Sequence, residues 1–577
     1  MRHVRTPLIA SVLFVATIAH AAWLGPSGNP VAPTFHGRPV ALYRDGGSGV
    51  FVAYQGLDVP GGGSIRLQHV LGDGTIAPGW PAEGAVVCSL AVTTELGQLK
   101  AISDGAGGAL LVWDENFWLT SGTFYVQHVL ASGARAGGWP ARGRAVLPSG
   151  TLYSPESVAD GAGGVLFVWS AGAQILSQRI RGDGTNAPGY PATGKVLLQL
   201  SGAGTWSGPA VASAHGGGFW LSALLAGGDS LTTPWAHRIW RLGATGALDL
   251  TWAGDDGNGF IIPTPSNALA SGLATVLDDG GNGAFVLMSV GTREVVTHVL
   301  SDQSIDPVWP GPLLDLGSIG DFSVSQQGTL ALDGAGGLYA QWPSENIPGA
   351  SGSLRRARID GTLDPDWTAP VPISPDYQPV LFADAAGVYA SGMQLLSCPE
   401  QDCSGVSAIG RWSANGSTPA GWPETGGAYR SPGEYALPDS AYGGVVAMVG
   451  DGGGEVFVAW TTPDVRTVIS YGIAATVRVM RFQAAGPVAG VGSRAEGPLA
   501  IRGTRFTREG IRCSISGAAV AELMLFDLLG RRVSRAEVAP GARDVLVPGT
   551  GALAPGLYLV RVRAGTAEAH AKVFVVR

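Results

Sequence analysis

Two ten-residue stretches, DGAGGALLVW (Asp104–Trp113) and DGAGGVLFVW (Asp160–Trp169), decide how this chain is interpreted. The same element recurs at Asp45, Asp279, Asp333 and Asp451, and degenerate copies start at His215 and Asp384. The eight starts lie 51 to 67 residues apart, a longer and less regular period than helical solenoids show. The chain is therefore a repeat array. An aromatic residue stands nine positions after the Asp in five copies, and we expect these rings in equivalent core positions: Tyr54, Trp113, Trp169, Trp342 and Trp460.

A second marker, an aromatic residue usually followed by Pro, comes after each of the first seven starts and is missing from the eighth unit. Runs between the markers, such as FYVQHVL and ILSQRI, alternate with the period of a strand that has one buried face. Each unit resolves into four short strands; in the third these are SVAD, VLFVW, ILSQRI and KVLLQL, with the Asp-Gly turn joining the first two. The second markers are Trp80, Trp139, Tyr190, Trp252, Trp309, Trp367 and Trp422.

Four strands per unit, eight units and no expected helix predict an all-β fold, a β-propeller whose blades pack around an axis. The DGxGGxxxxW repeats resemble those of secreted bacterial propellers over residues 38–490. Eight blades are expected, and seven are the alternative if one degenerate unit is an insertion. An array of β-sandwiches is disfavoured, because units of about 58 residues are too short for sandwiches of roughly 100.

The composition and the N-terminal residues indicate in which cellular compartment the protein works. The 577 residues include 89 Gly and 38 Pro, and the formal net charge is −8 with no Lys/Arg run after the first few residues, which excludes nucleic acid as a partner. Residues 1–21 read as a signal peptide, with Arg2 and Arg5, an apolar run and a cleavage site at Ala19-His20-Ala21. A transmembrane anchor is the competing interpretation, but the run is shorter than the ~20 residues a span needs. We therefore expect a propeller over residues 22–490, exported through the periplasm.

Cysteines and acids offer few sites for a cofactor. Cys398 and Cys403, in SCPEQDCSG, are the candidates for a disulfide across a loop, while Cys88 and Cys513 are expected as thiols. We expect no cofactor. The repeated Asp raises the alternative of structural calcium, yet one carboxylate followed by glycines better fits a side chain that caps its own turn.

The tripeptide Arg181-Gly182-Asp183 resembles a receptor-binding signal of animal extracellular proteins. The same position holds LGDGT at Leu71, ASGAR at Ala131, LGATG at Leu242 and IDGTL at Ile359. Every unit needs a tight turn there, and Gly, Asp and Thr supply its backbone geometry. We therefore interpret the tripeptide as a turn, with receptor binding as the alternative.

No catalytic signature is present: the chain lacks a nucleophile elbow, a P-loop, HExxH and paired carboxylates. The histidines of QHVL and THVL, His69, His128 and His298, occupy equivalent strand positions and suggest a shared structural slot. The remaining acids that could line a central funnel are Asp114, Glu115, Asp255, Asp256, Asp278 and Asp279.

The composition changes near residues 486–500, where a Gly/Ala/Pro-rich linker, placed at 491–497, closes the repeat region. Residues 498–577 read as strands of a small Ig-like β-sandwich. This segment resembles the type A sorting domain of type IX secretion substrates and is similar to the Ig-like domain of flagellar hook-capping proteins. The matching positions are Asp527, Gly530, Arg531, Gly556 and Tyr558.

The resemblance implies an export address, with the outer-membrane export machinery as partner and release or attachment at the cell surface. In place of the family's PNP opening this chain has LAIRGTRFTREG, so a plain Ig-like spacer is the alternative. The sequence thus predicts a secreted or surface-displayed, non-enzymatic propeller that binds a protein or glycan. A secreted carbohydrate-active hydrolase or lyase and a structural surface-layer component are the other candidates.

Overall fold

The computed structural model divides the chain into two compact units, residues 1–490 and 491–577. The described part contains strands and turns but no α-helix. The predicted signal peptide (1–21) and linker (491–497) lie outside the described residues, as do Cys398, Cys403, Asp527 and Gly530. The structure describes residues 29–575 except 36–39, 57–62, 91–95, 116–122, 147–154, 201–203, 228–234, 253–258, 266–269, 320–326, 348–349, 374–379, 398–403, 421, 423–433, 437–445, 451–453, 470–471, 484–485, 488–499, 508–509, 517–520, 527–530, 539–543, 551–552, 555 and 565–566.

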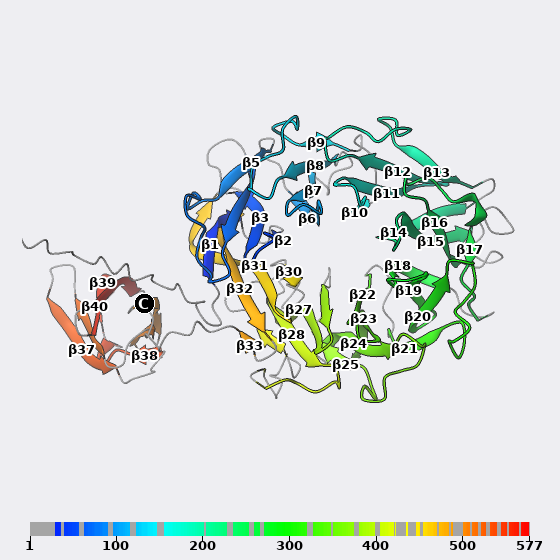
Figure 1. Cartoon of the computed structure of the whole chain (residues 1–577). Helices are drawn as coiled ribbons and strands as arrows, with labels where there is room; N and C mark the ends of the chain where they lie inside the picture. The colour runs from blue at the N-terminus through cyan, green and yellow to red at the C-terminus, as the bar shows by residue number, and fades with distance from the viewer. Residues whose placement is uncertain are drawn as a thin grey trace, which may run out of the picture. The chain divides into compact units, whose positions relative to one another are not determined.

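The first unit is a ring of eight antiparallel blades, so the predicted propeller is confirmed (Figure 1). Six blades are separate four-stranded sheets, and β1 (Asn29–Phe35) joins blades 8 and 1 into one nine-stranded sheet. Blade 1 consists of β2 (Val40–Arg44), β3 (Val50–Gly56), β4 (Ser64–Val70) and β5 (Ala85–Ser89), and blade 2 of β6 (Leu96–Ser103), β7 (Ala109–Glu115), β8 (Thr123–Val129) and β9 (Arg144–Ala145). Blade 3 consists of β10 (Glu156–Ala159), β11 (Val165–Ala171), β12 (Gln174–Ile180) and β13 (Lys195–Gln199), and blade 4 of β14 (Gly204–Ser213), β15 (Phe219–Gly227), β16 (Ala236–Leu242) and β17 (Phe260–Ile261).

Blade 5 consists of β18 (Ala270–Asp278), β19 (Gly283–Val290), β20 (Arg293–Leu300) and β21 (Leu314–Ser318), and blade 6 of β22 (Thr329–Leu332), β23 (Gly337–Ile347), β24 (Ala350–Arg358) and β25 (Val371–Ile373). Blade 7 consists of β26 (Leu381–Asp384), β27 (Gly387–Ser397), β28 (Ser404–Ser413) and β29 (Glu434–Ala436). Blade 8 contains β30 (Ala447–Gly450), β31 (Val456–Ile469), β32 (Gly472–Gln483) and, from the N-terminus, β1 (Asn29–Phe35); the short β33 (Gly486–Pro487) also pairs with β32.

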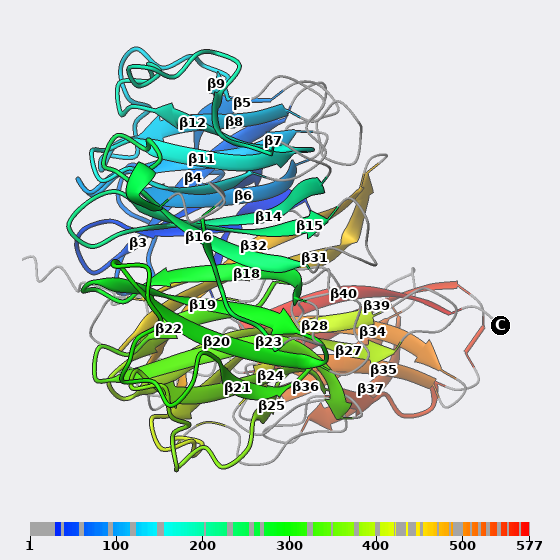
Figure 2. The same cartoon turned by 90° about the vertical axis from the view of Figure 1, so that its right-hand side faces the viewer.

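The strands run between the two faces of the ring (Figure 2). Because all four strands of a blade are antiparallel, the links from first to second strand and from third to fourth strand lie on one face, which we call the turn face. The first strand of each blade lies nearest the ring axis (Figure 1). Side chains at turn-face positions of neighbouring blades can therefore form one continuous surface.

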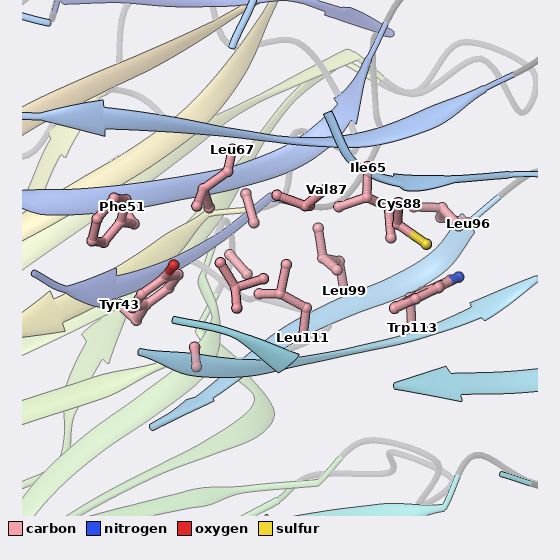
Figure 3. Close-up of a cluster of buried hydrophobic side chains, with 14 of the residues drawn as sticks. Tyr43, Phe51, Ile65, Leu67, Val87, Cys88, Leu96, Leu99, Leu111 and Trp113 are labelled. Atoms are coloured by element: carbon pink, nitrogen blue, oxygen red, sulfur yellow. The ribbon is translucent and has the colours of Figure 1, made fainter. Parts of the chain in front are cut away.

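Buried apolar side chains gather between neighbouring blades. The cluster between blades 1 and 2 includes Phe51, Leu67, Leu99 and Trp113 (Figure 3). Eight clusters of this kind fill the eight contacts between blades, the last of them joining blade 8 to blade 1. Each fully buried large side chain contributes about 1.5–3 kcal/mol relative to exposure, so these interfaces hold the ring together. The predicted core aromatics are all buried there: Tyr54, Trp113, Trp169, Trp342 and Trp460.

The N-terminal strand closes the ring. β1 pairs with β32 of blade 8 over Asn29–Phe35, and Thr34 also pairs with Gly56 of blade 1. Its Val31 and Ala32 join the apolar cluster between blades 8 and 1. Blade 8 therefore takes its fourth strand from the other end of the propeller, which explains why its sequence lacks the second marker. No local sequence pattern predicts this pairing, because its two strands lie at opposite ends of the propeller.

The second unit is a sandwich of two antiparallel sheets, as the sequence predicted. One sheet has the order β34 (Ala500–Thr507), β35 (Gly510–Ser516), β38 (Asp544–Leu546). The other has the order β37 (Arg532–Val538), β36 (Ala521–Phe526), β39 (Gly556–Ala564), β40 (Ala567–Val575). Ile511 and Cys513 from the first sheet pack with Leu523, Val560 and Val573 from the second.

Candidate ligand-binding face

The repeated turn acid is structural. In blade 2 the Oδ1 atom of Asp104 accepts the N–H groups of Ala106 (2.7 Å) and Gly108 (2.9 Å), while Oδ2 bonds Nε2 of His128 on the third strand at 3.0 Å. Burial alone would raise the pKa of the Asp104 carboxyl, but the hydrogen bonds from His128, Ala106 and Gly108 outweigh it and hold the pKa below its usual range. The predicted turn cap is confirmed, and it also ties the first hairpin to the third strand.

The predicted slot for His69, His128 and His298 is confirmed, and arginines occupy it in the other blades. The slot residue pairs with the turn acid in six blades, for example Arg179 with Asp160 (2.9 Å) and Arg411 with Asp384 (3.0 Å). In blade 8, where the turn itself lies outside the described residues, Arg481 pairs with Glu455. Strand register places one His or Arg in this slot in every blade: His69, His128, Arg179, Arg241, His298, Arg356, Arg411 and Arg481.

The fourth blade departs from this scheme, and its turn begins one residue earlier than the sequence indicated. Ala214 N donates to Gly218 O at 3.0 Å, just as Asp160 N donates to Gly164 O at 2.9 Å in blade 3. Ala214 therefore stands where the other blades have the acid, and His215 is the next residue of the turn. The expectation that His215 starts this copy was wrong because three successive glycines can be aligned with the other copies in more than one register.

The second-marker aromatics bind the next blade. Nε1 of Trp139 donates to Gly182 O at 3.0 Å, and Nε1 of Trp309 donates to Ile359 O at 3.0 Å. Each accepting carbonyl belongs to the tight turn between the third and fourth strands of the following blade. These aromatic side chains thus pack between neighbouring blades, and their hydrogen bonds hold the blades together.

Arg181-Gly182-Asp183 lies in such a turn, as predicted. Gly184 N donates to Arg181 O at 2.8 Å, and Thr185 N donates to Oδ1 of Asp183 at 2.9 Å. The carbonyl of Gly182 accepts hydrogen bonds from Trp139 and from Nδ1 of His128, both in the preceding blade. The same hydrogen-bond pattern starts at Leu71, Leu130, Gly243 and Arg358, so three of the four equivalences drawn from the sequence were offset by one residue.

The acids that could have lined a funnel have structural partners. Asp114 and Glu115 are buried, with Asp114 accepting Gln98 N at 2.5 Å and Glu115 paired with Arg142. Asp278 accepts Nε1 of Trp220 at 2.8 Å, and Asp279 caps its turn and bonds His298. Asp255 and Asp256 lie outside the described residues. All four described acids thus have structural hydrogen-bond or ion-pair partners.

Large apolar side chains are exposed on the turn face of three consecutive blades, and no sequence pattern predicted them. Leu250 (78% exposed), Val308 (69%) and Ile359 (46%) lie in the third-to-fourth-strand links of blades 4, 5 and 6. The links touch: Gln303 of blade 5 donates to Thr251 O of blade 4, and Trp309 of blade 5 donates to Ile359 O of blade 6. We call Leu250, Val308 and Ile359 the apolar rim. Where blades 1 to 3 have Gly, Ala or Pro at the equivalent positions, this rim has large aliphatic side chains.

The matched sorting-domain positions are only partly described. Arg531 is exposed, Gly556 begins β39, and Tyr558 belongs to the core of the sandwich. The hydroxyl of Tyr558 donates to Ala554 O at 3.0 Å, a bond back to the preceding segment of the kind that fixes a corner in Ig-like folds.

Metal and thiol chemistry finds little support in the described residues. Cys88 and Cys513 are buried thiols, and burial raises the pKa of the Cys88 thiol to about 12. Within the ranges given above, His, Cys, Asp and Glu side chains form no group of three that could hold a metal ion. The same residues include no apolar helix long enough to cross a membrane.

Comparisons with known proteins assign no family. No family model matches the chain, and no curated protein matches it. Similar solved structures include a prolyl endopeptidase studied for inter-domain dynamics (13% identity, TM-score 0.37, 76% of this chain and 55% of that one). They also include prolyl oligopeptidase B from Galerina marginata (11%, 0.38, 84% and 59%) and a PL25 ulvan lyase (10%, 0.35, 71% and 94%). This chain thus spans little more than half the length of the two peptidases, and the similarities assign it neither ligand nor activity.

Proposed function

We propose that this chain is a secreted or surface-displayed, non-enzymatic propeller that binds a protein partner through the apolar rim of blades 4 to 6. The observation that carries the proposal is the departure of this rim from the repeat. Residues shared by all blades are used in turns and blade contacts, whereas Leu250, Val308 and Ile359 point large aliphatic side chains to solvent on adjacent blades. Such a cluster of apolar residues in loops on a rigid scaffold is typical of an interaction surface.

The chemistry of the rim favours a protein over a glycan. Sugar rings are commonly bound by exposed aromatic faces, and the exposed large apolar residues of this rim are aliphatic. Burying each of them would contribute about 1.5–3 kcal/mol before the costs of association. Asp302, Asp360 and Asp366 are exposed beside them and favour a partner that brings basic side chains to the edge of the contact.

The rim is tested by comparing two triple variants of the mature protein. Leu250→Ser, Val308→Ser and Ile359→Ser together should abolish capture of a partner from a library of displayed host-surface proteins, because the apolar contact is lost. The control carries Val86→Ser, Val196→Ser and Ile261→Ser, three exposed apolar residues of fourth strands, and should bind like the unaltered protein. Equal binding by both variants, or binding to a glycan array alone, would contradict a protein-binding rim.

The hydrolase or lyase alternative has no support among the described residues, since Asp114, Glu115, Asp278 and Asp279 all have structural partners. Catalysis in this fold would need free acids or bases near the axis. Of the charged residues in the first strands, Lys100 and Glu156 lie 3.5 Å apart in neighbouring blades and neutralise each other. We therefore keep binding as the proposed function.

We also propose that residues 498–577 direct export. The Ig-like fold of this unit, and the corner formed by Tyr558, support the resemblance to a sorting domain. Deleting residues 498–577 in the native host should leave a folded propeller in the periplasm, because the ring has its own apolar contacts between all blades. The same residues fused to a signal-bearing reporter should carry it to the surface or the medium. Normal amounts of the truncated protein in the medium would show that the unit is a spacer.

A further inference from the structure

The charge of the chain is divided unevenly between its two units. Residues 498–577 contain 12 Lys and Arg against 6 Asp and Glu, whereas residues 1–497 contain 24 against 38. The acidic first part therefore conceals a basic second unit within the net charge of −8. Such an asymmetry within one chain is typical of a basic part that contacts an anionic partner.

The register of the four-stranded sheet of this unit gathers cations on the face that points away from the sandwich core. Leu523 of β36 packs in the core, so Met524, the next residue, lies on the opposite face. Met524 pairs with Arg535 of β37 on one side and with Arg561 of β39 on the other. One row across three strands thus places two arginines beside the same methionine.

The next row, two residues further along β36, has a similar composition. Phe526 pairs with Arg532 of β37 and with Leu559 of β39, and Leu559 pairs in turn with Lys572 of β40. Residues directly opposite each other on adjacent strands have Cβ atoms about 4.5–5.5 Å apart, so both rows are compact. Because these cations come from separate strands, no long run of basic residues marks them in the sequence. We call the surface the basic face; it consists of Met524, Phe526, Arg532, Arg535, Leu559 and Arg561.

Two arginines of the basic face have no carboxylate partner among the described residues. The guanidinium of Arg561 lies 5.1 Å from the centre of the Phe526 ring, its Nη2 donates to Sδ of Met524 at 3.6 Å, and its Nε has no hydrogen-bond partner. Arg532 is exposed and forms no ion pair. Arg535 pairs with a neighbouring glutamate, yet 57% of its side chain is exposed. These guanidinium groups keep N–H donors in the forked arrangement that suits phosphate oxygens.

We propose that the basic face binds the surface of an anionic lipid bilayer, with its arginines on headgroup phosphates and Leu559 against the first methylene groups of the acyl chains. Leu559 is 39% exposed in the row that also holds Arg532. Binding to a bilayer surface depends on buried apolar area together with attraction to anionic lipids, and this face offers both. A nucleic-acid backbone would supply phosphates but few aliphatic groups for Leu559. The proposal depends neither on the apolar rim nor on the export role of this unit.

Acids at one end of the sheet limit the strength of the contact. The row beyond Met524 contains Glu522, which pairs in register with Glu537 and Arg563. Each Lys or Arg near an anionic surface raises the affinity about fivefold, and this effect falls off within a Debye length, about 8 Å at physiological ionic strength. The few arginines of the basic face therefore predict reversible binding that weakens as salt is added.

The proposal is tested by co-sedimentation of the mature full-length protein with vesicles of phosphatidylcholine and phosphatidylglycerol in equal amounts. Binding is expected at low salt, with less at high salt and none to phosphatidylcholine alone. Arg532→Gln with Arg561→Gln should lower the affinity for the anionic vesicles about 25-fold. Arg532→Gln alone, an exposed substitution outside the sandwich core, should lower it about fivefold. Leu559→Ser should weaken binding while the salt dependence stays.

A control variant removes two charges from the other sheet of the same unit. Arg505 and Arg512 pair in register on β34 and β35, and Arg512 stands between the core residues Ile511 and Cys513. Arg505→Gln with Arg512→Gln should therefore bind anionic vesicles like the unaltered protein. An equal loss in both double variants would mean that net charge, rather than the basic face, governs binding, and would overturn the proposal. Binding to immobilised poly-glutamate without binding to vesicles would also overturn it, since the partner would then be an acidic protein.

Discussion

At the scale of single residues, the glycines between third and fourth strands have two tasks. The fourth residue of each of these turns has a positive φ, as at Gly184 (81°) and Gly361 (79°). In blade 6 the missing side chain also makes room for the wedge: a Cβ on Gly361 would lie 2.5 Å from the indole of Trp309. Gly334, in the Asp turn of the same blade, has a similar φ (69°) but open space around it.

Substituting Gly334 and Gly361 separately distinguishes the energetic cost of backbone strain from the cost of disturbed packing between blades. Gly334→Ala should lower the free energy of unfolding by about 1 kcal/mol, the cost of a left-handed backbone for a residue with a Cβ. Gly361→Ala should lower it by about 2–4 kcal/mol, because the displaced Trp309 ring adds an overpacking cost. Urea denaturation of both variants measures the difference. Equal losses would mean that Trp309 does not wedge against this turn.

Glu294, in blade 5, is a buried acid whose pKa is raised by its surroundings. It is 3% exposed, its Oε2 accepts the Ser289 hydroxyl at 2.7 Å, and burial raises the pKa of its carboxyl to about 7 despite that bond. Because the folded pKa lies above the unfolded value of 4.5, the unfolded chain loses this proton first. Stability therefore falls as pH rises from about 4.5 to 7, by about 3 kcal/mol.

Glu294→Gln keeps the hydrogen bond to Ser289 and removes the titration. The free energy of unfolding of the variant should exceed that of the unaltered protein by about 3 kcal/mol at pH 8 and by little at pH 4.5. Denaturant titrations at both pH values give the difference directly. A difference that stays constant across this range would show that Glu294 is ionised in the folded protein or equally shielded in both states.

At the scale of elements, the turn with Arg181-Gly182-Asp183 is held by the preceding blade through the carbonyl of Gly182. Asp183 is exposed, and hydrogen bonds from Thr185, with Arg181 nearby, lower the pKa of its carboxyl. These are turn contacts that recur in other blades, as between Asp73 and Thr75 or Asp360 and Thr362.

Asp183→Glu tests the receptor alternative. The longer side chain removes the tripeptide and disturbs only an exposed cap, so cell adhesion to the immobilised protein and Tm should both stay as they are. Gly182→Ala is the control for damage to the turn, because a Cβ on residue 182 would lie 2.8 Å from Gly163 O. Adhesion lost in Asp183→Glu at unchanged Tm would revive receptor binding.

The strands were predictable because their signals are local. An Asp-Gly turn fixes the first hairpin, and an aromatic residue nine positions later marks the buried face of the second strand, so the order of four strands follows from residues such as Asp160 and Trp169. What the sequence could not supply depends on partners far along the chain. The pairing of β1 with β32 and the bond from Trp139 to Gly182 each require a neighbouring blade, and the start of the blade 4 turn depends on a register that three glycines leave ambiguous.

The same limit explains the missed rim. Leu250, Val308 and Ile359 are unremarkable in sequence, and their exposure and adjacency come from the hydrogen bonds that join three successive links. The acids Asp114 and Glu115, by contrast, looked available in sequence, and burial with Gln98 and Arg142 removes them from any funnel.

At the scale of the whole molecule, the ring depends on one strand from the N-terminus. Removing residues 29–35 should leave the edge of β32 unpaired. It should also expose the apolar side chains between blades 8 and 1 that Val31 and Ala32 cover. We expect a lower Tm and concentration-dependent dimers or larger species, because an exposed strand edge pairs with other chains. Size-exclusion chromatography and thermal melts measure both effects, and removing only residues 22–28 is the control. A monomer with unchanged Tm would mean that blade 8 is stable with three strands.

The pairing of β1 with β32 also sets the order in which the propeller can be completed. A chain synthesised from its N-terminus makes β1 first and its partner β32 last, so the strand that finishes blade 8 waits while every other blade is made. A product that ends before residue 472 has no partner for β1 and leaves the apolar face of blade 1 without blade 8 to cover it. Closure therefore acts as a check on completeness: only a chain that carries all eight blades pairs β1 and buries this last apolar cluster.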